Sequence, residues 1–332
     1  IFESNLKCHK YRNIMNLNSK IYIAGHRGMA GSAIWRTLTA KGYNNLIGMS
    51  SADLDLRNQQ SVRNFISETK PDVIIDAAAR VGGILANNNY PYQFIMENLQ
   101  LQNNLIDSAL QEGVEKFIFL GSSCIYPRLA PQPLKEDYLL TGDLEPTNEW
   151  YAIAKITGVK ACQAIRKQFG KDYVSLMPTN LYGPFDNFHP EHSHVIPGLM
   201  RRMHQAKLDN QASLVIWGTG QARREFLHVD DLAAACFSYL QFSSAELAEF
   251  GADFLQYLNV GTGQDLTIAE LARLLAEVIG YSGELIFDSN LPEGTLLKRL
   301  DISKIQQLGW RPSVGLVDGL RSTYQWFLLQ EQ

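Results

Sequence analysis

Near its start the chain reads Ile21-Tyr22-Ile23-Ala24-Gly25-His26-Arg27-Gly28-Met29-Ala30-Gly31, and this run carries the clearest signal of the fold. Its first four residues are apolar throughout, as in a buried parallel strand. Three glycines follow with the spacing G-x-x-G-x-x-G and lead into Ser32–Lys41, which we expect to be a helix ended by Gly42. A strand, a glycine turn and a helix in this order predict a doubly wound α/β fold that opens with a dinucleotide site.

Each glycine of this turn has a predicted role. Gly25 permits the tight bend, Gly28 lets the backbone approach a pyrophosphate, and Gly31 lets the helix pack close to the strand. The free N–H groups of the helix N-terminus then face the phosphates. An ordinary strand–helix turn is the alternative, but the position of the turn directly after the first strand favours the dinucleotide site.

Strands and helices alternate through the first half of the chain, which predicts a Rossmann-type doubly wound parallel sheet over residues 20–180. The strands that we expect after Ile21–Ala24 are Leu46–Met49, Val73–Ile75, Lys116–Leu120 and Tyr173–Met177. The helices that we expect after Ser32–Lys41 are Ser61–Thr69, Pro91–Glu112 and Trp150–Phe169.

Prolines interrupt this pattern after about residue 180, so we expect a smaller α/β substrate-binding lobe over residues 181–329. Its expected elements are the helices Gly198–Lys207, Val229–Tyr239 and Leu266–Ile279 and the strands Leu214–Trp217 and Glu284–Phe287. Residues 225–262 are expected to return to the first domain, and residues 1–19 to form a flexible extension. Ligands of such folds bind outside the carboxyl ends of the strands, which predicts a site in the cleft between the lobes.

The composition of the 332 residues, with 45% hydrophobic and 19% charged side chains, fits a compact protein. The net charge of −4 and the lack of a basic stretch argue against nucleic-acid binding. No apolar run reaches the roughly 18 residues that a membrane span needs. The cysteines Cys8, Cys124, Cys162 and Cys236 lack paired spacing, which indicates reduced thiols and a cytoplasmic location.

Tyr151 and Lys155 lie four residues apart in the expected helix Trp150–Phe169, so they share one face about a turn apart. A nearby ammonium favours the phenolate, and we therefore expect Lys155 to lower the pKa of Tyr151. The pattern Tyr-x-x-x-Lys also occurs by chance in many helices. Combined with the dinucleotide turn, it predicts hydride transfer to or from a carbonyl or an alcohol.

Ser122, Ser123 and Cys124 follow the expected strand Lys116–Leu120. A hydroxyl at this strand end can polarise a substrate carbonyl together with Tyr151, although a structural serine is the alternative. A lone cysteine is usually a small core residue. So close to the candidate serine, Cys124 can instead face the substrate as a thiolate base.

The segment His189-Pro190-Glu191-His192-Ser193-His194 leaves three interpretations open. It can be a solvated loop, it can hold zinc, or one histidine can act as an acid near neutral pH. The proline and the lack of a nearby cysteine or carboxylate set argue against zinc, so we expect no metal site.

The choice between the nicotinamide cofactors depends on the end of the second strand, where an acid would bind the ribose 2′-OH of NAD. That strand ends in Met49-Ser50-Ser51, and Asp53 and Asp55 come later in the chain. Arg27, inside the glycine turn, can pair with a 2′-phosphate. These features favour NADP.

Four residues of the second half suggest a substrate that carries a nucleotide. Arg and Lys side chains can bind a diphosphate, and a tryptophan can stack on a base. Each residue alone is typical of a surface or a core. Together we take them as candidate ligands of a nucleotide-linked substrate: Arg202, Trp217, Arg224 and Lys298.

Several runs of the sequence resemble the extended short-chain dehydrogenase/reductases and, among them, the enzymes that act on GDP-4-keto-6-deoxy-D-mannose. The resemblance covers about residues 20–329 and is carried by Ala24–Met29, Ala79–Ile84, Ala86–Asn88, Gly121–Pro127, Glu145–Asn148, Tyr151–Lys155, Pro178–Pro184, Asp186–Pro190, Ser193–Pro197 and Arg224–Asp231. Three positions depart from the family pattern. No basic residue stands near Met49–Ser51, Trp150 replaces a proline, and Arg80 replaces a lysine.

What the resemblance implies is a two-step reaction: 3,5-epimerisation, then NADPH-dependent 4-keto reduction to GDP-L-fucose. It implies that Ser122, Tyr151 and Lys155 form the reductase triad, and that Cys124 and His194 are the base and acid of epimerisation. Contacts to NADP(H) are implied for Gly25, His26, Arg27, Gly28, Met29, Gly31, Leu120, Gly121, Ser122, Lys155, Pro178, Thr179, Asn180, Leu181 and His194. Arg202, Trp217, Arg224 and Lys298 would bind the GDP part. The family also implies a homodimer packed through two helices of each subunit.

Two other functions compete with this interpretation. Nucleotide-sugar 4,6-dehydratases usually carry an Asp-Glu pair where this chain has Ser123-Cys124, and a 4-epimerase would not need Cys124 and His194 together. A redox-sensing binding protein that has lost catalysis typically lacks the tyrosine or the lysine. Both Tyr151 and Lys155 are present in this chain.

Overall fold

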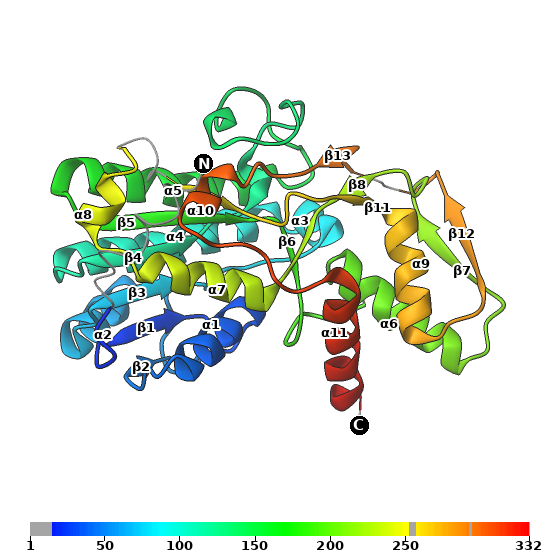
Figure 1. The fold of residues 1–332 in the computed structure, drawn as a ribbon, viewed down its shortest axis with the longest axis horizontal. Helices are drawn as coiled ribbons and strands as arrows, with labels where there is room; N and C mark the ends of the chain where they lie inside the picture. Colours follow the sequence, from blue (N-terminus) through cyan, green and yellow to red (C-terminus); the bar gives the residue numbers. More distant parts are fainter. Residues whose placement is uncertain (1–14, 191, 252–256, 292–293, 332) are drawn as a thin grey trace, which may run out of the picture.

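The computed structural model describes residues 15–190, 192–251, 257–291 and 294–331 (Figure 1). Most of the extension expected at residues 1–19, including Cys8, lies outside the described residues. Each of the other three cysteines is buried with a free thiol. Within the described ranges, no helix is both long and apolar enough to cross a membrane.

A six-stranded parallel sheet forms the larger part of the molecule, with the strand order β10-β5-β4-β3-β1-β2. Its strands are β1 (Ile21–Ala24), β2 (Leu46–Ile47), β3 (Val73–Asp76), β4 (Lys116–Leu120), β5 (Asp172–Pro178) and β10 (Leu258–Val260). Five of them come from the first 178 residues, whereas β10 returns from residues 258–260. The predicted doubly wound parallel sheet is confirmed.

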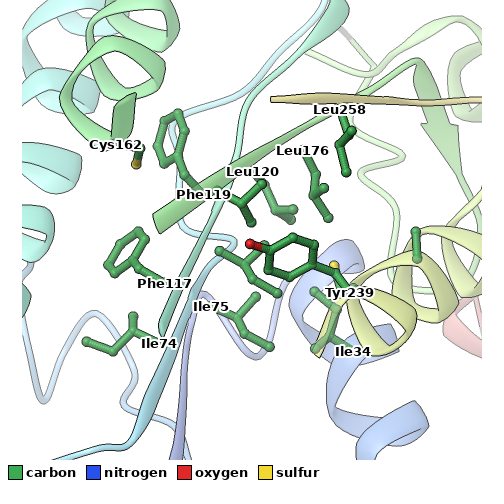
Figure 2. Close-up of a cluster of buried hydrophobic side chains, with 14 of the residues drawn as sticks. Ile34, Ile74, Ile75, Phe117, Phe119, Leu120, Cys162, Leu176, Tyr239 and Leu258 are labelled. Carbon is green, nitrogen blue, oxygen red and sulfur yellow. The ribbon is translucent and has the colours of Figure 1, made fainter. Parts of the chain in front are cut away.

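Helices cover both faces of this sheet (Figure 1). On one face α1 (Met29–Ala40) packs against α7 (Val229–Leu240), and on the other α4 (Pro91–Gln111) packs against α2 (Gln59–Thr69) and α5 (Glu149–Phe169). Both faces are therefore buried, which explains why the central strands are apolar without alternation. In Figure 2, Cys162 of α5 lies beside Phe119, whereas Ile34 of α1 and Tyr239 of α7 lie near Ile75.

The rest of the chain builds a smaller group of elements around a second hydrophobic core. The parallel pair β7 (Ser213–Trp217) and β12 (Glu284–Asp288) lies beside α6 (Val195–Leu208) and α9 (Ile268–Ile279), with α11 (Leu316–Gln330) next to α9. Two short sheets lie between the two cores (Figure 1). They contain β11 (Leu266–Thr267), β8 (Arg223–Arg224) and β13 (Leu297–Lys298), and β6 (Asn180–Tyr182) with β9 (Phe226–His228). The division into domains at residue 180 stays a prediction.

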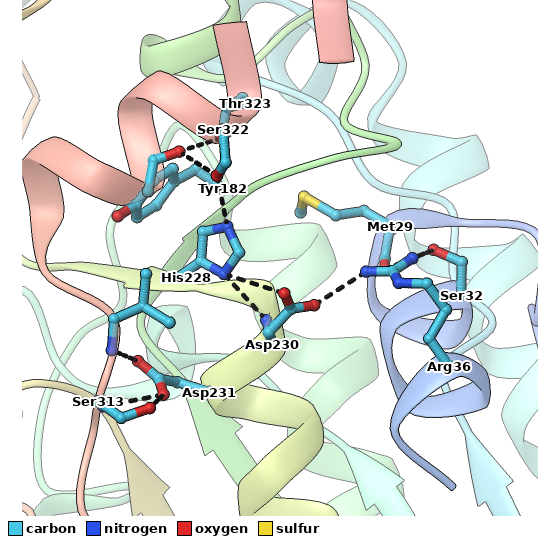
Figure 3. A network of polar contacts seen from close by, with 12 residues as sticks. Met29, Ser32, Arg36, Tyr182, His228, Asp230, Asp231, Ser313, Ser322 and Thr323 are labelled. Carbon is cyan, nitrogen blue, oxygen red and sulfur yellow. Dashed lines mark hydrogen bonds and ion pairs between the residues drawn. The ribbon is translucent and has the colours of Figure 1, made fainter. Parts of the chain in front are cut away.

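A polar network joins α1, α7 and α11 (Figure 3). Arg36 of α1 forms an ion pair of 2.9 Å with Asp230, whose backbone N–H donates to Nδ1 of His228. The other ring nitrogen of His228 lies 3.5 Å from Oγ of Ser322 on α11. Asp231 accepts hydrogen bonds from the backbone N–H groups of Ser313 and Val314. These contacts hold the segment before α11, and α11 itself, against the first core.

Most expected elements are present, and their ends differ for identifiable reasons. The first helix begins at Met29 rather than at Ser32, because Gly28 already acts as its N-cap residue. The first two residues of the expected helix Leu266–Ile279 form the strand β11 instead. The helix α9 begins at Ile268, after a capping box formed by Thr267 and Glu270. The elements that the sequence analysis missed are mostly short: α3 (Ile84–Asn89), α8 (Ser244–Ala248), α10 (Ser303–Gln307), η2 (Ser123–Ile125), η3 (Glu136–Tyr138) and the strands β6, β8, β9, β10, β11 and β13. The long helix α11 was missed as well.

Gly158 of α5 provides a test of helix–sheet packing, since a Cβ at this position would lie 2.4 Å from the Phe119 ring. We expect Gly158→Ala to destabilise the protein by on the order of 1–2 kcal/mol, because overpacking outweighs the better helix propensity of alanine. Urea unfolding measures the change. The matched control is Thr157→Ala, an exposed neighbour, which should stay within about 0.5 kcal/mol of the parent. A Gly158→Ala variant as stable as the parent would contradict this account of the packing.

Candidate active site

The site lies where the direction of the strand order changes. β1 and β3 are neighbours, but the chain continues from β1 to β2 on one side and from β3 to β4 on the other. In such sheets ligands bind at the carboxyl ends of the two strands that flank this switch point. Gly25 follows β1 with a φ of +74°, and a Cβ there would lie 2.8 Å from the carbonyl oxygen of Ala77, just after β3. The glycine turn is thus packed on the end of β3.

The glycine turn fits a bound pyrophosphate. A Cβ on Gly31 would lie 2.2 Å from the Gly25 carbonyl oxygen, so this glycine is required by the fold itself. Gly28 is exposed, and a Cβ there would meet only the Gly25 oxygen, at 3.4 Å. No side chain caps the N-terminus of α1, and its first turn carries no acid. The open face at Gly28 and the uncapped N–H groups are what an anionic group needs.

The residues beside the turn only partly determine which nicotinamide is preferred. His26 packs against Gly48 and Trp35, and burial, followed by the charge of Arg27, lowers its pKa. Arg27 is exposed. Asp53 accepts a hydrogen bond from the Ser50 hydroxyl group, and Asp55 forms an ion pair of 2.9 Å with Arg57. Because both acids after β2 have partners of their own, the preference for NADP stays a prediction here.

The candidate reductase residues lie at the carboxyl end of β4. Lys155 is buried in α5, and its Nζ donates to the Leu120 carbonyl oxygen at 2.8 Å. The same Nζ lies 4.5 Å from the centroid of the Phe119 ring and 5.9 Å from that of Tyr151. Ser122 follows β4, and its Oγ accepts a 3.3 Å hydrogen bond from the Cys124 N–H. The fold therefore brings Ser122, Tyr151 and Lys155 to one region.

The expected lowering of the Tyr151 pKa is wrong. Burial raises the pKa of Tyr151, and the nearby Cys124 and Asp76 raise it further. Burial also lowers the pKa of Lys155, whose hydrogen bond goes to a backbone carbonyl. Desolvation outweighs the helix-face pairing that the sequence suggested. At neutral pH Tyr151 is consequently a phenol that carries its proton.

The segment after β5 lies between the two cores. The Thr179 N–H donates to the Val260 carbonyl oxygen at 3.0 Å, and the side chains of Thr179 and Asn180 donate to the Glu225 carbonyl oxygen at 3.2 and 2.9 Å. Asn180, a candidate cofactor residue, also lines the larger cavity described next. Pro178 ends β5, and Leu181 packs against the first core.

Three of the four candidate nucleotide ligands line one cavity of about 290 Å³. Arg202, Trp217 and Arg224 line it together with His194. Trp217 is 41% exposed, so its indole face is available to a planar ligand. Two guanidinium groups beside an aromatic ring suit a phosphorylated nucleoside. Other lining residues are Gly83, Leu85, Asn180, Pro190, Ser193, Val195, Gly198, Leu199, Ile216 and Ile268.

The three histidines of the 189–194 segment separate into two environments. The rings of His189 and His192 stack at 4.5 Å, whereas His194 is the N-cap residue of α6 and faces the larger cavity. Its surroundings lower the pKa of His194 by disfavouring the charged imidazolium. In the described part of the chain, no three His, Cys, Asp or Glu residues are grouped as metal ligands.

Cys124 lines a second, smaller cavity of about 40 Å³, whereas His194 lines the larger one. The smaller cavity is lined by Cys124, Tyr126, Pro127, Arg128, Gln132, Leu134, Glu145, Asn148, Thr295, Leu297 and Lys298. Lys298 is therefore not in the larger cavity, although β13 pairs with β8 and places it opposite Arg224. Ser122, Tyr151 and Lys155 line neither cavity.

Sequence reasoning assigned no role to three polar residues near these cavities. Glu145 and Asn148 line the smaller cavity, and Glu225 is a fully buried carboxylate beside Arg224. Glu145 and Asn148 belong to the run Glu145–Asn148 that carried part of the resemblance. Glu225 belongs to the run Arg224–Asp231, which also carried part of the resemblance.

Comparison with known proteins gives consistent results. Residues 21–249 match the model of the NAD dependent epimerase/dehydratase family. GDP-L-fucose synthase 1 of Arabidopsis thaliana is 56% identical over 311 residues, covering 94% of each chain. The GDP-L-fucose synthase of Escherichia coli K12 is 51% identical and covers 93% of this chain and 96% of its own. A GDP-D-glycero-L-gluco-heptose synthase from Campylobacter jejuni, solved in the presence of NADPH, has a TM-score of 0.87 at 37% identity, covering 95% of this chain and 99% of its own.

Asp76, the last residue of β3, is a buried carboxylate at the switch point. Its Oδ1 accepts a 3.1 Å hydrogen bond from the Ala78 N–H, whereas Oδ2 has no partner. Burial raises the pKa of Asp76 from 3.8 to about 6, although Lys155 opposes the change. The unfolded chain therefore ionises at lower pH than the folded chain, and the folded state loses stability as the pH rises between these two values.

We expect Asp76→Asn, which is neutral at every pH, to stabilise the protein by on the order of 2–3 kcal/mol above about pH 7. The gain should be small near about pH 4 and should grow up to about pH 6. Denaturant unfolding across this range measures it, with the exposed Asp107→Asn as the charge-matched control. A gain that does not change with pH would contradict the assignment of a buried, titrating Asp76.

Proposed function

Because the chain belongs to the NAD dependent epimerase/dehydratase family, we propose that it converts GDP-4-keto-6-deoxy-D-mannose to GDP-L-fucose by 3,5-epimerisation and then 4-keto reduction. The resemblance to the extended short-chain dehydrogenase/reductases is confirmed by relatives of 56% and 51% identity that match nearly the whole chain. One observation carries the proposal. Cys124 lies within one short turn of Ser122 and interacts with Tyr151, which supports placing the proposed epimerisation base beside the proposed reductase triad.

Epimerisation needs a base and an acid on opposite sides of the sugar ring. The C4 ketone acidifies the protons at C3 and C5, so a thiolate of Cys124 can remove a proton and His194 can return one to the other face. His194 lines the larger cavity and Cys124 the smaller one.

Reduction of the C4 ketone needs a proton donor and a polarised carbonyl. The raised pKa keeps Tyr151 protonated, which suits a residue that donates a proton to the developing alkoxide. Ser122 would hydrogen-bond the same oxygen, and the Lys155 ammonium would stabilise the phenolate that Tyr151 leaves behind. Bound NADPH supplies the hydride in chemistry of this kind.

The remaining candidate residues would bind the cofactor and the GDP part. We propose that the glycine turn from Gly25 to Gly31, the Leu120–Ser122 edge, Lys155, Pro178–Leu181 and His194 hold NADP(H). The uncapped N-terminus of α1 and the exposed Gly28 support this assignment. Arg202, Trp217 and Arg224 would bind the diphosphate and guanine of the substrate, supported by their shared cavity.

We also propose that the protein is a cytoplasmic homodimer. Three buried free cysteines suit a reducing compartment. The neighbouring helices α4 and α5 expose Tyr92 (69%), Trp150 (41%) and Phe169 (51%), an apolar set that a second copy of the chain can cover. Light scattering should give about twice the chain mass of 37.3 kDa, whereas the mass of one chain would refute the dimer.

The decisive assay follows absorbance at the NADPH band after addition of GDP-4-keto-6-deoxy-D-mannose, with NADH in a parallel sample. We expect oxidation with NADPH and GDP-L-fucose as the product. Oxidation that yields only the unepimerised sugar would keep the reductase role and remove the epimerase role. No oxidation with either cofactor would refute the proposed function.

In the same assay, Tyr151→Phe should reduce the rate of NADPH oxidation at least about 10²-fold, the scale of general acid catalysis. Binding of NADPH, followed by fluorescence, should change little because the aromatic ring remains. Tyr92→Phe, an exposed tyrosine of α4, is the matched control and should keep the parent rate. A Tyr151→Phe variant with the parent rate would show that Tyr151 is only a packing residue.

A further inference from the structure

Lys298 lies in a different place from the other candidate GDP ligands. Arg202, Trp217 and Arg224 share the larger cavity, whereas Lys298 lines the smaller one with Cys124 and Glu145. The side chain is half-buried, although a lysine is rarely taken out of water without a partner. The ammonium of Lys298 and the thiol of Cys124 therefore share one small cavity.

The backbone that carries Lys298 is fixed on both sides. β13 pairs in parallel with β8, which places Lys298 opposite Arg224. The next residue, Arg299, receives a 2.7 Å hydrogen bond from the Leu134 N–H and donates its own N–H to Oε1 of Gln132 at 3.0 Å. The Leu300 N–H donates to Oε2 of Glu225 at 2.7 Å. These contacts hold the backbone of Lys298 beside the smaller cavity.

The loop that carries Cys124 is tied to the same strand. Tyr126, two residues after Cys124, donates its hydroxyl to Oδ1 of the buried Asn259 at 2.5 Å. Nδ2 of Asn259 donates to the carbonyl oxygens of Leu134 (2.9 Å), which forms a bridge with Leu300, and Asp301 (3.1 Å), which follows β13. One amide side chain therefore fixes the Cys124 loop relative to the strand of Lys298.

The charges around Cys124 come from several elements. Burial raises the pKa of the thiol, and the groups that oppose this are, in order, Lys298, Ser122 and Lys155. Tyr151 of α5 also interacts with the sulfur. Burial lowers the pKa of Lys298, and Cys124 is the strongest of the groups that raise it, ahead of Glu145 and Glu225. Arg224 acts in the opposite sense on Lys298.

Glu145 carries the carboxylate that lines the smaller cavity together with Lys298. Its two carboxylate oxygens accept weak hydrogen bonds from Thr147 and Thr295, at 3.4 and 3.3 Å. No ion pair within 4.0 Å joins Glu145 to Lys298 among the described contacts. Among the described residues, no carboxylate therefore forms an ion pair with the ammonium, and the Cys124 thiol lines the same cavity.

From this arrangement we propose that Lys298 is a positioning residue of the epimerisation, whose ammonium stabilises the thiolate of Cys124, rather than a ligand of the GDP phosphates. The proposal rests on the proposed function, in which Cys124 is the base. As the thiolate takes a proton from the sugar, the S–H bond forms, the C–H bond breaks and the electron pair moves to the ketone oxygen. Lys298 keeps its proton throughout, and nothing is oxidised or reduced.

The first test needs no substrate. The rate at which iodoacetamide alkylates Cys124, read by peptide mass spectrometry, reports the thiolate fraction at each pH. We expect Lys298→Met to move the midpoint of this profile upward by about one pH unit or more, since it removes a nearby positive charge. Lys298→Arg keeps the charge and should stay near the parent midpoint. Lys160→Met, exposed on α5, is the control for loss of one positive charge.

The second test measures function in the same variants. Lys298→Met should slow the incorporation of solvent deuterium at C3 and C5 at least about tenfold, while the dissociation constant for GDP stays within about twofold. An unchanged alkylation midpoint together with weaker GDP binding would overturn the proposal and make Lys298 a phosphate ligand. An equal upward shift in Lys298→Arg and Lys298→Met would also overturn it, because packing rather than charge would be the cause.

Failure of the proposed function gives a different result. If the parent protein exchanges no sugar protons, the reaction assignment is wrong, but the alkylation profiles still decide whether Lys298 acts on Cys124. Lys298→Gln, a smaller change that also removes the charge, replaces Lys298→Met if that variant does not fold. The midpoint shift is then expected to be the same.

Discussion

The parallel register of β1, β3 and β4 determines where the groups of the candidate site lie. It pairs Ala24 with Asp76 and Asp76 with Phe119, so the glycine turn and Ser122 leave the sheet at the same edge. The close approach of α5, permitted by Gly158, then brings Lys155 to the Leu120 carbonyl oxygen. Hydride chemistry and proton transfer can share one site only because these strands end together.

Burial is the dominant influence on the ionisable groups of this site. It raises the pKa of Asp76, Tyr151 and Cys124 and lowers that of Lys155 and Lys298. Each group is held closer to its neutral form than it would be in water, which costs stability. A neutral resting site suits a reaction in which charge develops transiently, because the surrounding groups can then respond to it.

The sequence was informative where the signal is local. β1, β4 and the helix of Tyr151 could be predicted because an apolar run, a glycine turn and a helix-face spacing each depend on neighbouring residues. The direction of the Tyr151 pKa could not be predicted, since it depends on burial by residues distant in the chain, such as Phe94 of α4, and on Cys124 and Asp76. The cavity of Lys298 depends on the pairing of β13 with β8. Helix α11 was missed partly because Gly319 weakens its pattern, and this glycine is needed to make room for the hydroxyl of Tyr182.

The central claim is that one chain both epimerises and reduces a GDP-linked keto-sugar, and it can be tested without the cofactor. The protein is incubated with GDP-4-keto-6-deoxy-D-mannose in deuterated water, and the sugar is analysed by NMR. The account predicts enzyme-dependent deuterium at both C3 and C5, lost when Cys124 is replaced by serine. A sugar that exchanges no more deuterium with the protein than in buffer alone would contradict it.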